Sequence, residues 1–402
     1  MSAPRILLTS LSGQLGGLEL RLADEARQLQ SCGTEPMLAI SPFPGLQPWL
    51  QGLRQSGLQT AEFSPPPFFE EWRYRRLRKL WACTYHLRQL RDLAPDLVHV
   101  AYAWTHTGGS RLWLADRAGI PSVISVHNTF PVAALPPWSA RLMREAFRSV
   151  RGIYGVSRSA LAAFQANYGE FIATTTAQTV IHNFVDTRRF HFSEERRRQA
   201  RAQLDLPDDA LVLGSIARLD KQKEPLTVLR CFEQVSRVVP NTYLVYVGSG
   251  GLEAEVKALA QKLGLTSRIR HLPFTPAPEL IYPGLDVHLL LSRQEGFGIS
   301  TVEAMASGVA VICSDVPGSR DVLETAGTGR LVAYNDVEGT TRALIELLSD
   351  SAHRQALGRT GEQAAREHFD RTIWQQRLGS FYDTVLPASG RTPTHDSPVP
   401  QR

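Results

Sequence analysis

Segments typical of buried strands alternate with segments typical of helices along nearly the whole chain. The apolar run RILLTS at 5–10, for example, precedes an amphipathic stretch at 18–33 that Gly33 closes. Such alternation predicts parallel sheets with helices on both faces, and it occurs in each half of the chain. We therefore expect an α/β protein with two doubly wound domains. The predicted strands are 5–10, 36–41, 96–102, 121–127, 152–157, 211–217, 242–248, 269–274, 286–292 and 309–314.

The length of 402 residues is too great for one ordinary core, which also favours two domains. The segment IHNFVDTRRF at 181–190 lies near the middle of the chain. We expect an N-terminal domain over 1–184 and a C-terminal domain over 185–367. The tail 388–402 is rich in Pro and Ser with almost no apolar residues, so it is predicted to be disordered.

The composition excludes several classes of protein. Hydrophobic residues make up 43% and charged residues 21%, as in globular domains. No run approaches the roughly 18 apolar residues of a membrane span, and the N-terminus lacks the layout of a secretory signal. The four cysteines have no metal-ligand spacing. These features predict a cytoplasmic protein, and the net charge of +5 is compatible with anionic partners.

The stretch EGFGISTVEAMASG at 295–308 places two carboxylates beside a glycine-containing loop after a predicted strand. In open α/β sheets, ligands bind beyond the carboxyl ends of the strands. One interpretation is structural: Ser300 and Glu303 form a capping box, and Glu295 is a solvated acid. The other is functional: a carboxylate at a helix start accepts hydrogen bonds from a sugar diol, while the helix N-terminus attracts phosphate. This segment alone does not decide between them.

A second stretch, GSIARLDKQKEP at 214–225, follows another predicted strand with two cations, Arg218 and Lys223. Isolated cations after a strand are usually surface charges. Here, however, both lie at the same predicted sheet edge as the two glutamates. Two cations could bind a diphosphate and neutralise it as it leaves, and the sequence has no D-x-D motif to hold Mg²⁺ for that purpose.

Two features of the first half point toward the same cleft. The glycine-rich turn SLSGQLGGLE at 10–19 matches neither a dinucleotide fingerprint nor a P-loop, but Gly17 could bring its N–H group to a phosphate or sugar. His127 follows the strand at 121–127. A single histidine is more often structural than catalytic, but the position of His127 after a strand leaves both roles open.

The order of these motifs resembles one family. GSIARLDKQK fits an Arg-x4-Lys motif, EGFGISTVEAMASG fits E-x7-E, and VIHNFVD fits the segment between the domains. Together they resemble the family-four retaining glycosyltransferases, and the resemblance covers about residues 5–386. It implies a GT-B fold, in which two Rossmann-like domains face a central cleft, and a C-terminal helix over 368–387 that crosses back to the N-terminal domain.

The resemblance also implies roles for individual residues. Arg218 and Lys223 would bind the donor diphosphate, Glu303 the ribose, and Glu295 the donor sugar, with His127 near that sugar. Backbone groups of the glycine turn and of the helix start would complete the donor site: Gly16, Gly17, Phe297, Gly298 and Ile299. The chain departs from many members at Asn128, Phe184, Glu224 and Leu291. None of these changes removes a charged donor ligand, although Asn128 could alter the choice of sugar.

The implied reaction is the transfer of a sugar from a UDP- or GDP-sugar to a hydroxyl of a glycan or lipid-linked glycan, with retention of anomeric configuration and without a metal or other cofactor. Exopolysaccharide or lipopolysaccharide biosynthesis is the expected setting. Two alternatives stay open, namely an idle GT-B scaffold or sensor and a nucleotide-sugar epimerase. The four intact charged residues argue against the idle scaffold, and product analysis would reveal an epimerase.

The stretch 70–93 combines seven Arg and Lys residues with apolar residues at near-helical spacing. An amphipathic helix with a solvated basic face explains it most simply. The alternative is a helix that contacts anionic lipid, which would place the protein at the inner face of the membrane. No recognition motif for nucleic acid is present, so nucleic acid is not expected as a partner.

Overall fold

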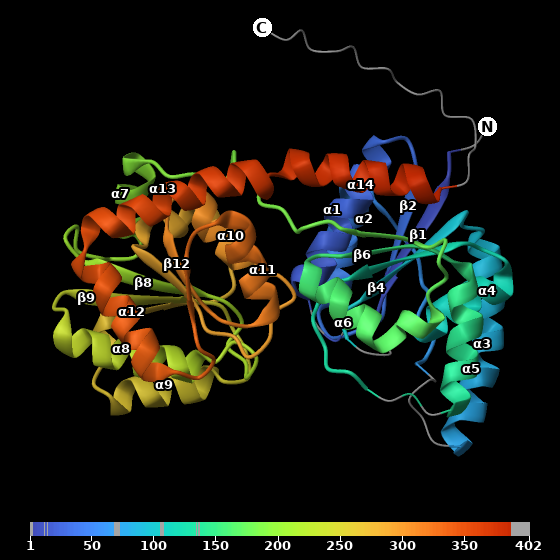
Figure 1. Ribbon diagram of the computed structural model, residues 1–402, viewed down its shortest axis with the longest axis horizontal. Helices are drawn as coiled ribbons and strands as arrows, with labels where there is room; N and C mark the ends of the chain where they lie inside the picture. The colour runs from blue at the N-terminus through green and yellow to red at the C-terminus, as the bar shows by residue number, and fades with distance from the viewer. Residues whose placement is uncertain are drawn as a thin grey trace, which may run out of the picture.

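The computed structural model describes residues 3–11, 13, 15–67, 73–104, 108–133, 135 and 137–386, with the backbone alone at 73–80, 137 and 138. Two fully parallel sheets with helices on both faces confirm the predicted α/β class. Figure 1 shows one sheet at each end of the molecule. The segment between the sheets, from 181 to 210, contains the predicted domain boundary.

The N-terminal sheet has the order β3-β2-β1-β4-β5-β6-β7. Alternate residues of β1 pack on opposite faces, as a strand geometry requires, with Leu7 on one side and Ile6 and Leu8 on the other. The strands are β1 Arg5–Ser10, β2 Glu35–Ile40, β3 Gln59–Thr60, β4 Leu97–Tyr102, β5 Ser122–Val126, β6 Val150–Gly155 and β7 Ala177–Val180.

Two sets of helices cover this sheet. One face packs against α1 Gly17–Ser31, α2 Leu46–Gln55 and α14 Arg371–Val385. The other packs against α3 Arg73–Leu93, α4 Gly109–Ala118, α5 Pro137–Ala146 and α6 Arg158–Tyr168. Gly33 has φ +78° just after α1, so it closes that helix as predicted.

The C-terminal sheet has the order β10-β9-β8-β11-β12-β13. Its strands are β8 Leu211–Ile216, β9 Thr242–Val247, β10 Ile269–Leu272, β11 Val287–Leu290, β12 Ala310–Ser314 and β13 Arg330–Val332. One face packs against α8 Pro225–Val238, α9 Glu253–Lys262 and α12 Val337–Ser349. The other packs against α7 Glu194–Gln203, α10 Ile299–Ala306, α11 Pro317–Ala326 and α13 Ser351–His368.

The chain crosses between the two sheets twice. Val185 on the first crossing forms a parallel bridge with Asp370 on the return, between α13 and α14. Helix α14 then packs on the N-terminal sheet, so close to β6 that a Cβ at Gly152 would lie 2.6 Å from a methyl group of Val385. Figure 1 shows α13 and α14 running along one side of both lobes. Helix α14 lies within the range 368–387 for which a crossing helix was expected.

Helix α3 covers most of the predicted basic stretch, although residues 70–72 and the side chains of 73–80 lie outside the described residues. Its buried face includes Cys83 and Leu90, whereas Trp81 is 78% exposed and Tyr85 68% exposed. Trp81, one of the apolar residues of the stretch 70–93, therefore points to solvent. The predicted disordered tail 388–402 also lies outside the described residues. Among the described helices, none is long and apolar enough to cross a membrane.

Candidate functional site

The strand order of the C-terminal sheet reverses at β8, which lies between β9 and β11. The chain runs outward from β8 to β10 and then returns to β11 on the other side of β8. Such a switch point separates the loops that follow the two central strands and creates a crevice, which is where ligands bind in this class of sheet. The two loops are 217–223 and 291–298, which carry five of the predicted site residues, namely Arg218, Lys223, Glu295, Phe297 and Gly298.

An ion pair joins these two loops. Lys223 Nζ contacts Glu295 Oε1, and the side chains are only 15% and 6% exposed. Ser292 donates a second hydrogen bond to Glu295 Oε1 at 2.6 Å. A buried carboxylate needs such partners, because removing a charge from water is costly. Lys223, which was predicted to bind the diphosphate, and Glu295, which was predicted to bind the sugar, thus lie side by side as an ion pair.

Polar contacts along the same loops fix their spacing. Gln222 donates from Nε2 to the carbonyl of Gln294 at 2.9 Å, and accepts from the N–H of Arg293 at 2.8 Å. Arg218 is held at the rim, where its guanidinium pairs with Asp220 at 3.1 Å and its side chain is 39% exposed. The second predicted cation therefore lies on the same loop but stays in contact with solvent.

Helix α10 begins in this crevice without a side-chain cap. Its N-cap, Gly298, has φ 92° and ψ 66°, a left-handed conformation that favours glycine. Ser300 lies inside the first turn, so the predicted capping box with Glu303 is wrong. The failure of this prediction has a physical basis in Gly298: its conformation starts the helix two residues earlier than a serine cap at Ser300 would. No side chain competes with a ligand for the first amides of the helix.

Glu303 lies in the second turn of α10 and is partly buried. Tyr282 donates a hydrogen bond to its Oε2 at 2.9 Å. Burial raises the pKa of Glu303 to about 7, because loss of hydration outweighs this hydrogen bond and the nearby positive charges of Arg21 and Arg189. Arg21 belongs to α1, so Glu303 lies where the two domains meet. Glu303 is therefore not a capping residue; it lies between the two domains.

Arg21 is a residue that sequence reasoning missed. It is 6% exposed, lies with its guanidinium 3.7 Å from the centre of the Phe184 ring, and donates to the Phe184 carbonyl at 3.1 Å. Burial lowers its pKa to about 10. The amphipathic pattern of 18–33 does not predict a buried Arg21, because an arginine in such a helix is expected to face solvent.

The glycine-rich turn of the N-terminal domain reaches α10 directly. A Cβ at Gly17 would lie 3.3 Å from Cδ1 of Ile299, so the two domains nearly touch at these predicted residues. The N–H of Gly16 is used locally, because it donates to Glu19 Oε2 at 2.8 Å. Gly16 is therefore a structural part of the turn in this arrangement, whereas Gly17 faces the other domain.

A second contact joins the domains beside His127. A Cβ at Gly296 would lie 2.1 Å from the carbonyl oxygen of His127, which only glycine avoids. Thr129, which sequence reasoning also missed, donates to the carbonyl of Glu295 at 3.1 Å. The loop that carries Glu295 thus packs directly against the end of β5, and His127 lies beside it as the sequence predicts.

The His127 ring is held from one side. Its Nε2 lies 2.8 Å from Ser125 Oγ. Burial lowers the pKa of His127 to about 3, so the ring is neutral at physiological pH. Phe297, by contrast, is 3% exposed and packs with ring centroids 5.7 Å from His182 and 5.6 Å from Phe369. Its side chain belongs to the core, so only its backbone is placed for a ligand.

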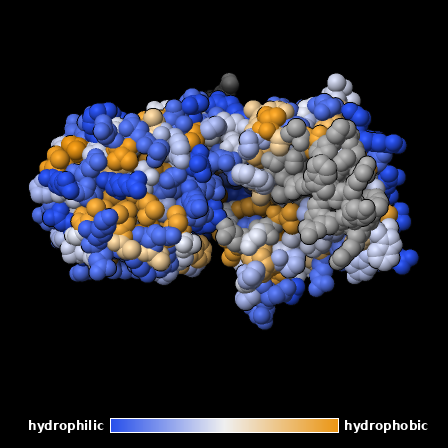
Figure 2. Space-filling model, turned by 90° about the horizontal axis from the view of Figure 1, so that it is seen from below, coloured by the Kyte–Doolittle hydropathy of each residue, from blue (hydrophilic) through white to orange (hydrophobic). Residues whose placement is uncertain are grey.

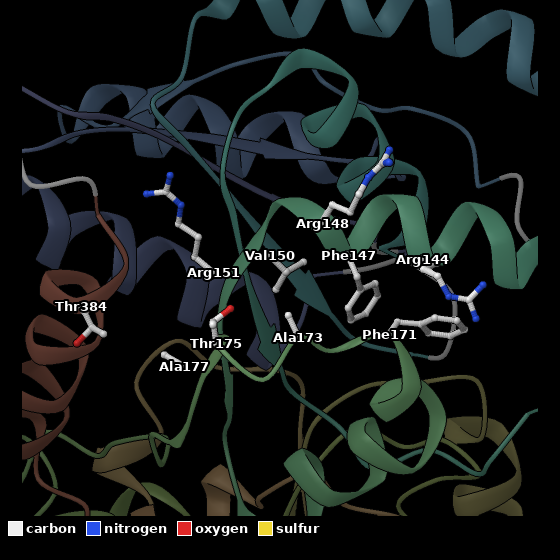
Figure 3. Close-up of a pocket in the computed structure, with 10 residues that line it drawn as sticks. All are labelled: Arg144, Phe147, Arg148, Val150, Arg151, Phe171, Ala173, Thr175, Ala177 and Thr384. Carbon is white, nitrogen blue, oxygen red and sulfur yellow. The ribbon is translucent and has the colours of Figure 1, made fainter.

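The two halves of the molecule enclose a hollow on the side away from α13 and α14 (Figure 2). A separate cavity of about 470 Å³ lies at the amino end of β6 (Figure 3), whereas His127 follows the carboxyl end of the neighbouring strand β5. Figure 3 shows three arginine guanidinium groups pointing in different directions around an apolar floor, so their charge does not converge. The lining residues are Arg144, Phe147, Arg148, Val150, Arg151, Phe171, Ala173, Thr175, Ala177 and Thr384, none of which was predicted for the site.

Among the residues that the structure describes, no group of three or more His, Cys, Asp or Glu side chains is arranged to hold a metal ion. Residues 15–189 match the family described as Glycosyltransferase Family 4, and residues 196–364 match Glycosyl transferases group 1. The chain belongs to the family-four glycosyltransferases of GT-B fold.

Relatives of this family-four glycosyltransferase support the same assignment. It is 33% identical over 215 residues to the lipopolysaccharide core biosynthesis mannosyltransferase LpcC of Rhizobium leguminosarum bv. viciae, a match that covers 52% of this chain and 60% of the relative. It is 27% identical over 402 aligned positions to a D-inositol 3-phosphate glycosyltransferase of Stackebrandtia nassauensis, which covers 93% and 88%. For the first three relatives the match spans 60%, 54% and 62% of their own length.

Solved structures show the same fold. A glycosyltransferase from Rickettsia africae has a TM-score of 0.79 at 16% identity and covers 97% of this chain and 100% of its own. Anabaena Alr3699/HepE, solved in complex with UDP and glucose, has a TM-score of 0.75 at 19% identity and covers 95% and 100%. Both similarities extend through the two sheets and the crossing helix, since nearly the whole chain is covered.

Proposed function

We propose that this chain is a retaining glycosyltransferase that moves a sugar from a nucleotide diphosphate sugar, a UDP- or GDP-sugar, to a hydroxyl of a glycan or lipid-linked glycan. The observation that carries this proposal is the buried pair of Lys223 and Glu295 at the switch point, next to the uncapped N-terminus of α10. A cation, a carboxylate and free helix amides meet there, and these groups suit a diphosphate joined to a sugar.

The chemistry needs charge stabilisation at one place. As the bond between the anomeric carbon and the phosphate oxygen breaks, negative charge grows on the nucleoside diphosphate. In this proposal Lys223, Arg218 and the α10 amides stabilise that charge, and such preorganised groups typically contribute about 10²–10³ in rate each. The acceptor oxygen would attack from the same face, and its proton would pass to the leaving phosphate oxygen. This accounts for retention and for a reaction in which the protein's own cations serve instead of a metal.

No side chain of the crevice is positioned as an obvious nucleophile. Glu295 Oε1 already accepts from Lys223 and from Ser292, which suits a binding role. A retaining hydrolase would instead place two carboxyl groups roughly 5 Å apart across the reacting bond. Glu303 is tied to Tyr282 in the second turn of α10, and its partly buried carboxyl suits the ribose diol.

Similarity supports the donor and the setting. One relative is a lipopolysaccharide core mannosyltransferase, and Anabaena Alr3699/HepE was solved with UDP and glucose. We extend the proposal to an acceptor in a bacterial surface glycan, exopolysaccharide or lipopolysaccharide. The exposed aromatic pair Trp81 and Tyr85 on α3 supports a further part of the proposal, contact with the inner face of the membrane.

Product analysis tests the proposed reaction. The purified chain is incubated with UDP- and GDP-sugars, with EDTA present and with glycan or lipid-linked acceptors, and nucleoside diphosphate release is measured. We expect release with one donor class, and a product whose anomeric configuration by NMR matches the donor. An isomerised nucleotide sugar without transfer would support an epimerase. An unchanged donor with every acceptor would support the idle scaffold.

A further inference from the structure

A continuous chain of buried hydrogen bonds leads from His127 into the N-terminal domain. His127 Nε2 lies 2.8 Å from Ser125 Oγ, and His99 Nε2 lies 2.7 Å from the same oxygen. On its other side, His99 Nδ1 lies 3.2 Å from Glu25 Oε1. Ser125, His99 and Glu25 are each 0% exposed, although they come from β5, β4 and α1. Nothing in the donor chemistry proposed above uses these three polar residues.

Two tyrosines fix the direction of the hydrogen bonds at the far end. Tyr382 donates to Glu25 Oε1 and Tyr154 donates to Glu25 Oε2, both at 2.7 Å. Burial opposes ionisation of Glu25, yet His99 and these hydrogen bonds lower the pKa of its carboxyl below the ordinary value. Tyr382 Oη also lies 2.9 Å from His99 Nδ1. Because the single tyrosine hydrogen is given to Glu25, His99 Nδ1 can meet both oxygens only as a donor.

The remaining hydrogens follow from counting. When Nδ1 carries the only hydrogen of the His99 ring, Nε2 has a lone pair, which is filled by the Ser125 hydroxyl as donor if Ser125 gives its hydrogen to His99 and not to Tyr154, its other partner. Ser125 Oγ then accepts from His127, so the hydrogen of that ring lies on Nε2. His127 Nδ1 is left as an acceptor, and it has no hydrogen-bond partner within the described part of the chain. Glu25, the partner of His99, thus sets the tautomer of His127 through His99 and Ser125.

We propose that Glu25, His99 and Ser125 are positioning residues that fix His127 as the tautomer protonated on Nε2, so that Nδ1 accepts a hydrogen bond from a hydroxyl of the bound sugar. This inference rests on the proposed function for the identity of the ligand. The groups that face His127 are compatible with a neutral acceptor: Glu25 and Arg21 from α1, His99 from β4 and the Tyr154 ring from β6, whose centroid is 6.5 Å away.

The chain also gives the crossing helix a part in the site. Tyr382 belongs to α14, so the last described helix orients Glu25 and, through it, the ring of His127. A donor sugar with a hydroxyl at the facing position would gain a hydrogen bond, and a deoxy sugar would leave Nδ1 without a partner. Such unmet hydrogen bonds are a strong source of selectivity.

The tautomer can be measured directly in the full chain. The protein is labelled with ¹⁵N-histidine, and long-range ¹H–¹⁵N spectra are recorded at pH 8.5, without ligand; the signals lost in His127→Gln assign this ring. We expect Nε2 protonated and Nδ1 unprotonated in the wild type and in Ser125→Thr, which keeps the hydroxyl. In Ser125→Ala we expect signals of mixed tautomers. A hydrogen on Nδ1 in the wild type, or an unchanged tautomer in Ser125→Ala, would overturn the inference.

A binding experiment connects the tautomer to the sugar. The affinities of wild type and Ser125→Ala are compared for UDP and for UDP-glucose. We expect UDP affinity to be unchanged, and UDP-glucose affinity to fall about 3- to 10-fold, the size of one hydrogen bond. Equal losses for both ligands would indicate general disruption and contradict a role at the sugar. If the wild type binds neither, the same comparison is made with GDP and a GDP-sugar; binding of none of the four overturns the donor class of the proposed function, while the NMR result still decides the tautomer.

Discussion

The two sides of the cleft are built from different chemistry. On the C-terminal side, loops 217–223 and 291–298 are held together by the Lys223–Glu295 ion pair and by amide hydrogen bonds. On the N-terminal side, the backbone of Gly17 and the neutral ring of His127, whose pKa burial keeps near 3, face these loops, while the charged groups of this side, Glu19 and Arg21, are buried. In the proposed donor site, we therefore expect the C-terminal side to bind the charged diphosphate and the N-terminal side to recognise the neutral hydroxyls of the sugar.

The contrast has a structural cause. The charged loops lie at a switch point, where the backbones diverge and leave room for side chains and ligand. The neutral groups lie where the domains press together, at Gly17 against Ile299 and at Gly296 against the backbone of His127. Close backbone approach leaves little space for a hydrated charge. The four predictions below test this comparison, from the largest expected effect to the smallest.

Lys223→Ala should have the largest effect. It removes the cation next to the diphosphate and leaves the Glu295 carboxylate, which is only 6% exposed, without its charged partner. We expect the transfer rate to fall by about 10²–10³. The exposed Lys221 of the same loop provides the matched control, and Lys221→Ala should retain the rate within about twofold. Initial rates with saturating donor measure this, and equal losses in both variants would contradict the charged side.

Gly296→Ala should disturb the contact between the two sides. Its Cβ would lie 2.1 Å from the His127 carbonyl oxygen, so the loop or the domain must shift. We expect a loss of about 1–3 kcal/mol in the free energy of unfolding and weaker donor binding. Gly251→Ala, where a Cβ meets nothing within 4 Å, is the control. Denaturant unfolding measures the difference; a native-like Gly296→Ala would show that the loops are apart in solution.

Glu303 should make stability depend on pH. Its pKa rises from the ordinary 4.5 to about 7, so the folded state binds more protons than the unfolded state between these values. The contribution of Glu303 to stability is complete below about pH 4.5 and is lost as the pH rises through about 7. Relative to Glu303→Gln, the wild type should therefore lose on the order of 2 kcal/mol over this range. A pH-independent difference between the two unfolding curves would contradict the raised pKa.

Thr129→Val should give the smallest effect. It removes one hydrogen bond, from Thr129 Oγ1 to the Glu295 carbonyl at 3.1 Å, between the two sides. We expect a loss of about 1 kcal/mol in unfolding free energy, with donor affinity changed more than the transfer rate. Thr179→Val, at an exposed position of β7, should be nearly neutral. If the two substitutions behave alike, this contact does not help to hold the cleft closed.

Much of the fold was predictable from alternation alone. All ten predicted strands are present; nine are largely buried apolar runs, and the tenth, β10, is a half-buried strand at a sheet edge. The three strands that were missed, β3, β7 and β13, have two to four residues each and lie at or near the sheet edges, where burial is incomplete. These three short strands give no clear apolar run in the sequence, whereas β10, although short and half-buried, lies in the run IRHLPF and was found.

Site residues that directly follow a strand could be predicted from the sequence. Contacts between residues that only the fold brings together could not. The loops that carry Lys223 and Glu295 were located correctly at the sheet edge, yet their mutual pairing depends on the strand order. Arg21 and Thr129 gave no signal, since one lies inside an ordinary amphipathic helix and the other acts through its contact with a distant loop. The roles of all these residues toward a ligand stay predictions.

One measurement tests the central claim most directly: thermal stabilisation by UDP, GDP and their sugars, with EDTA present, in wild type, Arg218→Ala and Lys221→Ala. A ligand at a hundred times its Kd stabilises the native state by about 2.7 kcal/mol. We predict that one nucleoside diphosphate raises the melting temperature of wild type and Lys221→Ala, and that this increase is largely lost in Arg218→Ala. No increase with any ligand, or the same increase in all three proteins, would contradict a diphosphate site at the switch point.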